Sequence, residues 1–316
     1  MQRLLVRLPE HHQQHKSLAT KLYQTRAGYS GELIVDRILS EVAFPPGTKI
    51  LRDLTLEVNP QYLIQLDTLI LTPSRAILLE IKHYAGTVQF DEQSGKTIKT
   101  SADGEVEKFD CILHQLDRAK AGLEMWFKQK QFPLPIEPIL IMANPHVEIQ
   151  EFPESTTLKY AKQLPRHIRN LLNQEGDKLT EQQVETIAET LFRSQIRWKR
   201  KTACERFNIA PGELKKGVLC LECNGEVTRK MGRTWFCENC GQPGDSALEQ
   251  AVADWYLLIS PTLRNRQLKY FLKLNSASAA SIVFSQHRLK RAGKPPGTVY
   301  TWDYILPLRK NQKKPT

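Results

Sequence analysis

Asp67, Glu80 and Lys82 are the residues of this chain whose types and spacing best suit hydrolytic chemistry. They lie in two apolar segments, residues 62–71 and 76–83, which are rich in Leu and Ile and predict two strands. Carboxylates can bind a divalent cation, and a lysine beside them can offset negative charge on a phosphate group. Such chemistry requires the two strands to bring these three side chains together.

The four residues between the two segments predict the turn of a β-hairpin, because Pro73 suits the first central position of a type I turn. If these four residues form the loop, Leu71 faces Ala76, and the same register places Asp67 opposite Glu80. Directly opposed side chains have Cβ atoms roughly 4.5–5.5 Å apart, and like charges there are destabilising. Two facing carboxylates between apolar strands therefore need a compensating charge, and a divalent metal is the simplest one.

Strand side chains alternate between faces, so Glu80 and Lys82 share a face and His83 points to the other. The plain alternative is that Lys82 only neutralises a buried carboxylate for structural reasons. His83 is predicted to be a core or surface histidine rather than a ligand.

Four short stretches extend the pattern around this hairpin: GELIVDRIL, QLDTLIL, LLEIKHYAG and LHQLDRA, in this order between Gly31 and Ala119. With Asp67 and the Glu80-Ile81-Lys82 triplet, they resemble the core of the PD-(D/E)XK nuclease superfamily. More narrowly they resemble the NERD (nuclease-related) domain, with a looser similarity to about Gln195.

This resemblance implies an α/β core in which a central mixed sheet is flanked by helices. It implies that Mg²⁺ or Mn²⁺ is bound by Asp67, Glu80 and the main-chain carbonyl of Ile81. It also implies that Lys82 positions or deprotonates the attacking water, so that the metal and the lysine together stabilise charge on the phosphodiester.

The resemblance adds two site residues, Glu32 on a first helix and Gln115 on a later one. Apolar periodicity independently predicts helices over residues 31–42 and 110–127. Glu32 lies on the inward side of its helix, and its alternative role is a charge favoured by the helix N-terminus. Gln115 lies at the edge of an apolar stripe, where a solvated glutamine is the alternative. The proline that commonly precedes this glutamine is replaced by Asp110-Cys111-Ile112, which leaves the start of the helix open.

Two CxxC pairs separated by thirteen residues predict a zinc ribbon, a fold that they resemble. Four thiolates form a closed tetrahedral site, which is structural rather than catalytic. Gly225 and Gly241 suit turns with positive φ, and residues 226–230 and 233–236 predict a hairpin that turns at Met231-Gly232. Two disulfides are the alternative, which the lack of a secretion signal disfavours. The expected zinc ligands are Cys220, Cys223, Cys237 and Cys240.

The net charge of the chain is concentrated at its C-terminal end. Residues 261–316 contain twelve Lys or Arg and one acid, Asp303, so this segment carries the whole net charge of +11. A neutral body with one cationic end predicts a polyanion-binding module there. DNA is the expected partner rather than a membrane, because no basic amphipathic helix with a Trp/Leu face is present.

Three predicted helices, residues 246–259, 263–272 and 276–287, precede a predicted basic hairpin at residues 288–302. The first helix is expected to open with a capping box from Ser246 to Glu249. This order resembles a winged helix-turn-helix domain, whose third helix enters the major groove; a winged helix that binds protein is the alternative. The residues expected to bind DNA are Ser278, Ser281, Ser285, Gln286, Arg288, Lys290, Arg291 and Lys294.

The 316 residues therefore predict a multidomain protein, with no stretch near the roughly 20 apolar residues that span a membrane. The predicted parts are a flexible or loosely docked N-terminal arm (1–26), a NERD-like nuclease domain (27–196), a basic linker (197–217), the zinc ribbon (218–244), an α-rich winged-helix-like domain (245–306) and a basic tail (307–316).

A strand at 138–142 and a helix at 180–195 are expected to complete the nuclease domain. The predicted function is a cytoplasmic, Mg²⁺-dependent nuclease that hydrolyses phosphodiester bonds in DNA, with a structural Zn²⁺. The alternative is a non-catalytic DNA-binding regulator that keeps the nuclease fold as a scaffold. Intact opposed carboxylates favour the enzyme.

Overall fold

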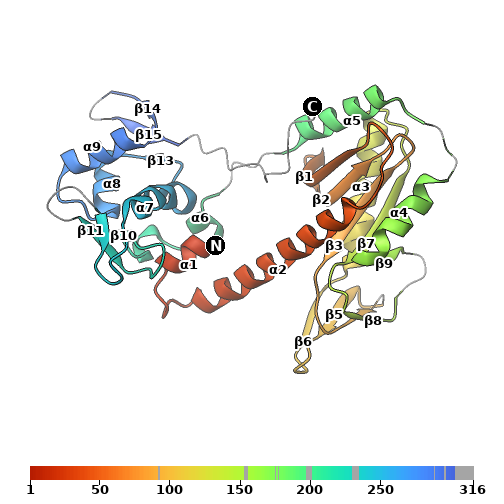
Figure 1. Cartoon of the computed structure of the whole chain (residues 1–316), viewed down its shortest axis with the longest axis horizontal. Coiled ribbons are helices and arrows are strands. Elements are labelled where there is room, and N and C mark those ends of the chain that lie inside the picture. The colour runs from red at the N-terminus through yellow and green to blue at the C-terminus, as the bar shows by residue number, and fades with distance from the viewer. Residues whose placement is uncertain are drawn as a thin grey trace. The chain divides into compact units, whose positions relative to one another are not determined.

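The computed structural model describes residues 1–302, apart from residues 92, 153–155, 175, 177, 197–200, 230–234, 288, 295 and 296. The chain divides into two compact units. Tyr23–Arg197 is called the sheet unit here, and Met1–Leu22 together with Trp198–Thr316 is called the terminal unit. The long helix α2 (His15–Leu39) begins in the terminal unit and ends in the sheet unit (Figure 1). Among the described residues, none of the helices combines the length and apolar character needed to cross a membrane.

The sheet unit is built on a five-stranded mixed sheet, as the sequence predicts. The first three strands are antiparallel, and the last two run parallel to the third. In spatial order the strands are β1 (Lys49–Asn59), β2 (Tyr62–Leu71), β3 (Ala76–Lys82), β7 (Ile136–Met142) and β9 (Leu158–Tyr160).

Helices cover both faces of this sheet, and β3 is accordingly apolar on both sides. Ile77, Leu79 and Ile81 pack with α2 and α4 (Leu164–Leu172) on one face. Leu78 belongs to the other core, with α3 (Ile112–Gln129) and α5 (Glu181–Ser194). Because side chains alternate along β3, Leu78, Glu80 and Lys82 lie on the face opposite to the one that α2 covers.

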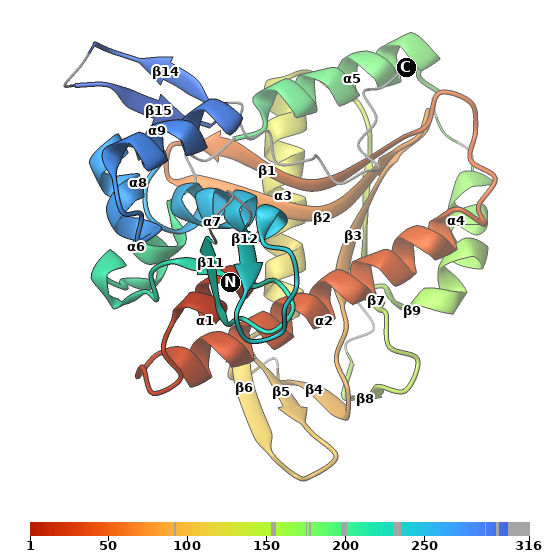
Figure 2. The same cartoon turned by 60° about the vertical axis from the view of Figure 1, so that its left-hand side comes forward.

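A second sheet continues from the C-terminal end of β3, in the order β6-β5-β4-β8, and projects from one end of the main sheet (Figure 2). Its strands are β4 (Thr87–Asp91), β5 (Lys96–Thr100), β6 (Val106–Asp110) and β8 (Glu148–Gln150). It also sets the start of α3, since the Ile112 N–H donates to Thr97 Oγ1 at 3.1 Å and the Cys111 N–H donates to the Gly95 carbonyl at 3.0 Å. The helix therefore begins at Ile112 and not at Asp110, and Gln115 lies in its first turn.

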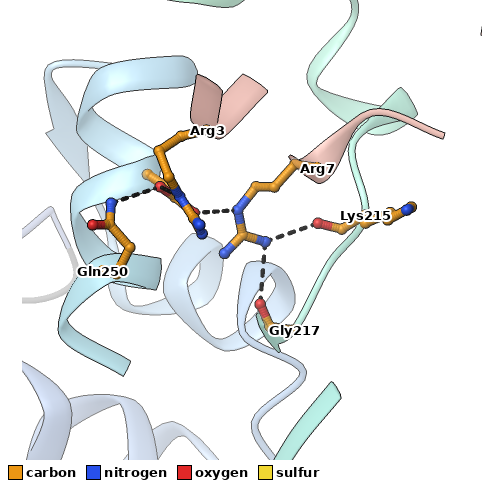
Figure 3. A network of polar contacts seen from close by, with 6 residues as sticks. Arg3, Arg7, Lys215, Gly217 and Gln250 are labelled. Atoms are coloured by element: carbon orange, nitrogen blue, oxygen red, sulfur yellow. Dashed lines mark hydrogen bonds and ion pairs between the residues drawn. The ribbon is translucent and has the colours of Figure 1, made fainter. Parts of the chain in front are cut away.

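The first residues of the chain form a helix, α1 (Gln2–Arg7), that buries Leu4 and Arg7, whereas the sequence predicts a flexible or loosely docked arm. The Arg7 guanidinium is 0% exposed, lies over the Phe271 ring at 4.5 Å, and donates from Nε to Asp254 Oδ2 at 2.6 Å. Its Nη1 donates to the carbonyls of Lys215 and Gly217 (Figure 3). Arg3 and Gln250 also donate to the Asp254 carboxylate, so α1 is an integral part of the terminal unit.

The rest of the terminal unit contains the predicted ribbon strands and helices, with additions. A helix, α6 (Ala203–Phe207), and a 3-10 turn, η2 (Pro211–Glu213), occupy the predicted linker, and Cys204 and Ile209 pack there against Leu4. The other elements are β10 (Val218–Leu219), β11 (Glu226–Arg229), β12 (Trp235–Cys237), α7 (Asp245–Leu258), β13 (Thr262–Leu263), α8 (Asn265–Phe271), α9 (Ala277–Gln286), β14 (Lys290–Ala292) and β15 (Val299–Thr301). A second 3-10 turn, η1 (Ala161–Gln163), lies in the sheet unit.

The start of α7 differs from the predicted capping box at Ser246. Gly244 occupies the N-cap position, and the helix begins at Asp245. A Cβ on Gly244 would lie 2.3 Å from Val227 Cγ1, and the Gly244 N–H donates to the Trp235 carbonyl at 2.8 Å. The start of this helix is therefore set by packing against the preceding hairpin instead of by a side-chain cap.

Candidate active site and metal centre

The hairpin that carries the predicted acidic residues has the expected turn and register. Leu71 pairs with Ala76 and Thr68 with Leu79. The Thr72 N–H donates to the Arg75 carbonyl at 2.9 Å, which closes the four-residue turn. Continued by one step, this register sets Asp67 opposite Glu80.

The ladder is interrupted at Asp67, where its carboxylate replaces a main-chain partner. Asp67 Oδ2 accepts a hydrogen bond from the Ile81 N–H at 2.9 Å. On the other side of β2, Asp53 has φ of 51° and drops out of the pairing between β1 and β2. In an extended strand the N–H and C=O of one residue point to the same neighbour, so the Ile81 carbonyl also faces the Asp67 side.

Glu80, Lys82 and Gln115 form one hydrogen-bonded cluster on the α3 side of the sheet. Lys82 Nζ lies 2.6 Å from Glu80 Oε1 and donates to Gln115 Oε1 at 3.2 Å. Glu80 is 1% exposed, which is unusual for a carboxylate. The structure thus brings three of the predicted residues into direct contact and places Asp67 beside them.

Together with Asp67, the cluster holds two carboxylates and a single lysine to balance them. Burial, followed by the Asp67 charge, raises the pKa of Glu80 to about 7. Burial alone would lower the pKa of Lys82, but Glu80, with smaller contributions from Tyr84 and Asp67, raises it above its ordinary value. A carboxyl group with a pKa this close to neutral shows how much the site disfavours a second negative charge, which a divalent metal would stabilise.

Glu32 lies on the helix that covers the opposite face of the sheet. The preceding Gly31 touches the end of β3, since a Cβ there would be 2.7 Å from His83 Cβ and 3.3 Å from Ala143 Cβ. Glu32 is half-buried at this same end of the strand. Its place in the site remains a prediction, whereas His83 does lie on the α2 side, away from Glu80.

Four cysteines form a second candidate centre, in the terminal unit. The Sγ atoms of Cys220, Cys223, Cys237 and Cys240 all lie within 4.8 Å of one another, so they can hold a metal ion such as zinc. The Asn239 side chain is the main cause that lowers the pKa of the Cys223 thiol to about 6. A hydrogen bond with the Gln242 main chain acts to lower the pKa of the Cys240 thiol, but burial and the other three cysteines raise it. Four thiolates this close together would repel one another, so full ionisation of the cluster requires a cation between them.

The turns of this centre differ in one detail from the sequence prediction. Gly241 has φ of 71°, as predicted, but at the first pair Asn224 takes the positive φ of 57°. Gly225 is instead closely packed, because a Cβ there would lie 3.0 Å from Asn239 Cβ and 3.2 Å from Cys223 Sγ. The predicted turn at Met231-Gly232 falls outside the described residues.

The predicted DNA-binding side chains lie on the surface of the terminal unit. Those on α9 and on the β14–β15 hairpin are exposed, and Ser281 Oγ accepts a hydrogen bond from Asn265 Nδ2 at 2.9 Å. Arg288 lies outside the described residues. On α8, Tyr270 is also exposed, by 64%, and has Lys216 Nζ 3.8 Å from its ring centroid.

Sequence reasoning missed Tyr84 and Tyr270, and it missed the pocket beside Gln115 that His114 and Arg118 line. Tyr84 stands two residues beyond Lys82 and affects its pKa. Tyr84 follows the end of β3, and its position two residues after Lys82 was the available signal. Tyr270 and the pocket could not be found in this way, because they depend on contacts between segments far apart in sequence.

A mixed sheet with a buried carboxylate–lysine cluster at the end of a central strand is consistent with a nuclease-like α/β core. Residues 27–143 match the family model of the nuclease-related domain, NERD. Comparison with curated proteins and with solved structures found no match.

Proposed function

We propose that the protein is a metal-dependent nuclease of the PD-(D/E)XK type that hydrolyses phosphodiester bonds in DNA. The observation that carries this proposal is the convergence of Asp67 and Glu80 around the main chain of Ile81, with Lys82 in contact with Glu80. The match of this segment to a nuclease-related domain supports it.

The donor set suits a hard divalent cation such as Mg²⁺ or Mn²⁺. Asp67, Glu80 and the Ile81 carbonyl offer only oxygen atoms, which these ions prefer. When bound there, the metal supplies Lewis acidity toward the phosphodiester and toward a water molecule. The high pKa of metal-free Glu80 reflects a negative site that lacks such a charge.

Lys82 and Gln115 have distinct roles in this proposal. Because Glu80 outweighs the effect of burial and raises the pKa of Lys82, its ammonium group positions water or phosphate oxygens and offsets their charge. Gln115 accepts from Lys82 and so fixes where the ammonium group points. Glu32 stays a candidate that approaches from α2.

The terminal unit would hold the nucleic acid. Four close thiols suit one structural Zn²⁺ in a ribbon, and such a site fits a reducing compartment such as the cytoplasm. From α7 to β15 the elements run helix, strand, helix, helix, strand, strand, with sheet order β13-β15-β14. That order supports a winged helix-turn-helix domain, with α9 in the major groove and the β14–β15 hairpin on phosphates.

The alternative function is a DNA-binding regulator that retains the nuclease fold without catalysis. The buried Glu80–Lys82 pair by itself is compatible with a nuclease and with a non-catalytic regulator, because a buried ion pair can also have a purely structural role. Asp67 favours the nuclease, since a purely structural ion pair does not need a second carboxylate that raises the pKa of Glu80.

Substitution of Asp67 tests the enzyme reading. Asp67→Asn keeps the acceptor for the Ile81 N–H but removes a charge, so we expect loss of Mn²⁺ binding and cleavage together with a higher metal-free melting temperature. Lys82→Met should keep metal binding and lose cleavage, whereas the surface substitution Glu124→Gln should change neither. The regulator hypothesis would be favoured if no DNA or RNA form is cleaved in the presence of metal and if Asp67→Asn strongly destabilises the protein.

A further inference from the structure

A pocket of about 360 Å³ opens beside the Glu80–Lys82 cluster, between β2 and the first turns of α3. Gln115 lines this pocket and also accepts the hydrogen bond from Lys82, so the pocket and the cluster share this side chain. The volume lies in the range of small-molecule sites, roughly 300–1,000 Å³. Whatever occupies the pocket would therefore lie next to the phosphodiester that is cut.

One wall of the pocket is an aromatic ring held in place. The Tyr62 hydroxyl donates to the Arg118 carbonyl at 2.5 Å, and the Arg118 guanidinium carbon lies 6.0 Å from the ring centroid. Gly122 allows this approach, because a Cβ there would be 2.5 Å from Ile64 Cγ2 and 2.9 Å from the Tyr62 hydroxyl. The ring therefore offers a fixed surface on which a planar group can stack.

The polar lining suits a sugar-phosphate unit. His114 and Arg118 are exposed on α3, four residues apart, and so lie on one side of the helix. Lys82 can only donate, so Gln115 presents its carbonyl oxygen to Lys82, and its amide protons can be donated to a phosphate oxygen. The acidic member of the lining, Asp110, is paired with Lys96 at 2.7 Å.

We propose that this pocket holds one unpaired nucleotide of the strand that is cut, adjacent to the scissile phosphodiester. Its base stacks on Tyr62, and His114 and Arg118 contact its sugar-phosphate backbone. A base within a duplex is stacked and paired, and entering a pocket would require it to leave the helix at a cost of a few kcal/mol. The substrate class is therefore single-stranded or frayed nucleic acid, an inference that rests on the proposed nuclease function.

Photo-crosslinking tests binding without depending on cleavage. The full chain is irradiated in EDTA with a short single-stranded oligonucleotide that contains 5-iododeoxyuridine, and the modified peptides are identified by mass spectrometry. We expect modification at Tyr62, reduced about tenfold in the double variant His114→Ala/Arg118→Ala, since loss of about 1.4 kcal/mol of binding is tenfold. Modification confined to residues 201–302 would overturn the proposal.

Cleavage with Mn²⁺ then separates the pocket from the catalytic proposal. We expect at least about tenfold faster cleavage of single strands than of blunt duplex, and about tenfold lower kcat/KM on single strands for the double variant. Arg169→Ala is the matched control, because Arg169 is an exposed arginine on α4, which packs on the opposite face of the sheet.

Two outcomes distinguish the proposals. A wild-type protein that cuts blunt duplex as fast as single strands, with an unaffected double variant, leaves the nuclease function standing and refutes the pocket assignment. A wild-type protein that cuts nothing but is modified at Tyr62 refutes the nuclease function, and the pocket then remains a nucleotide-binding site.

Discussion

At the scale of single residues, the site is defined by charges that the sheet holds together against their mutual repulsion. Glu80 is almost fully buried and contacts Lys82, while Asp67 is tied to the next main-chain amide, that of Ile81. Neither acid can move away without breaking a hydrogen bond in a buried part of the sheet. The metal-free protein therefore stores unfavourable electrostatic energy that a cation would relieve.

The stored energy predicts a pH dependence of stability in the metal-free protein. The pKa of Glu80 is about 7 in the fold against an ordinary value of 4.5, so between these values the folded state binds more protons than the unfolded state. The stabilising contribution of protonated Glu80 is complete below the lower value and is lost as pH rises through about 7. We expect the melting temperature of wild type to fall more than that of Glu80→Gln between about pH 5 and pH 8.

Thermal melting in EDTA at several pH values measures this difference. Glu124→Gln is the control, since it removes an exposed acid from α3 in the same unit. Parallel pH profiles for wild type and Glu80→Gln would show that Glu80 is ionised in the fold, contrary to this account.

At the scale of elements, the hairpin could be predicted from sequence because its determinants are local. Two continuous apolar runs and the four-residue turn with Pro73 between them specify a register that the pairing of Leu71 with Ala76 confirms. The interruption at Asp67 could not be predicted, since it involves the left-handed backbone of Asp53 on another strand. Likewise α1 is held by Asp254, 247 residues beyond Arg7, and no local pattern reports such a contact.

The ribbon is the element whose folding we expect to depend most on a metal. Its described strands are short, with two to four residues each, and the buried Cys237 and Val227 link them to α7. We expect one zinc per chain in freshly purified reduced protein, measured by inductively coupled plasma mass spectrometry. Cys237→Ser should abolish it, because closed sites of this kind need all four ligands.

The matched control for the zinc measurement is Cys204→Ser, which removes a buried thiol of the same unit that lies outside the four-cysteine cluster. It should retain the full zinc content. A zinc-free wild-type protein, or disulfides between the four cysteines, would contradict the ribbon assignment.

At the scale of the whole molecule, the net positive charge and the predicted catalytic residues lie in different parts of the chain. The predicted catalytic residues lie in the sheet unit, whereas residues 261–316 carry the whole net positive charge. Removing that segment would be a poor test of its role, because Leu263, Phe271 and Val283 belong to the core of the terminal unit. Exposed cations of the β14–β15 hairpin offer a test that leaves this core intact.

We expect Lys290→Gln/Arg291→Gln/Lys294→Gln to weaken DNA binding mainly through its salt dependence. Each phosphate contact contributes about −0.9 to the slope of log K against log salt on duplex DNA, so losing three should reduce the slope by about 2.7. The control is Lys128→Gln/Lys162→Gln/Lys178→Gln, which removes the same charge from exposed positions in the sheet unit. Because both variants change the net charge equally, a general electrostatic effect would lower both slopes alike and would contradict a DNA-binding role for the hairpin. A fall in the slope of the hairpin variant alone would show that this hairpin contacts phosphates, as a wing on DNA requires.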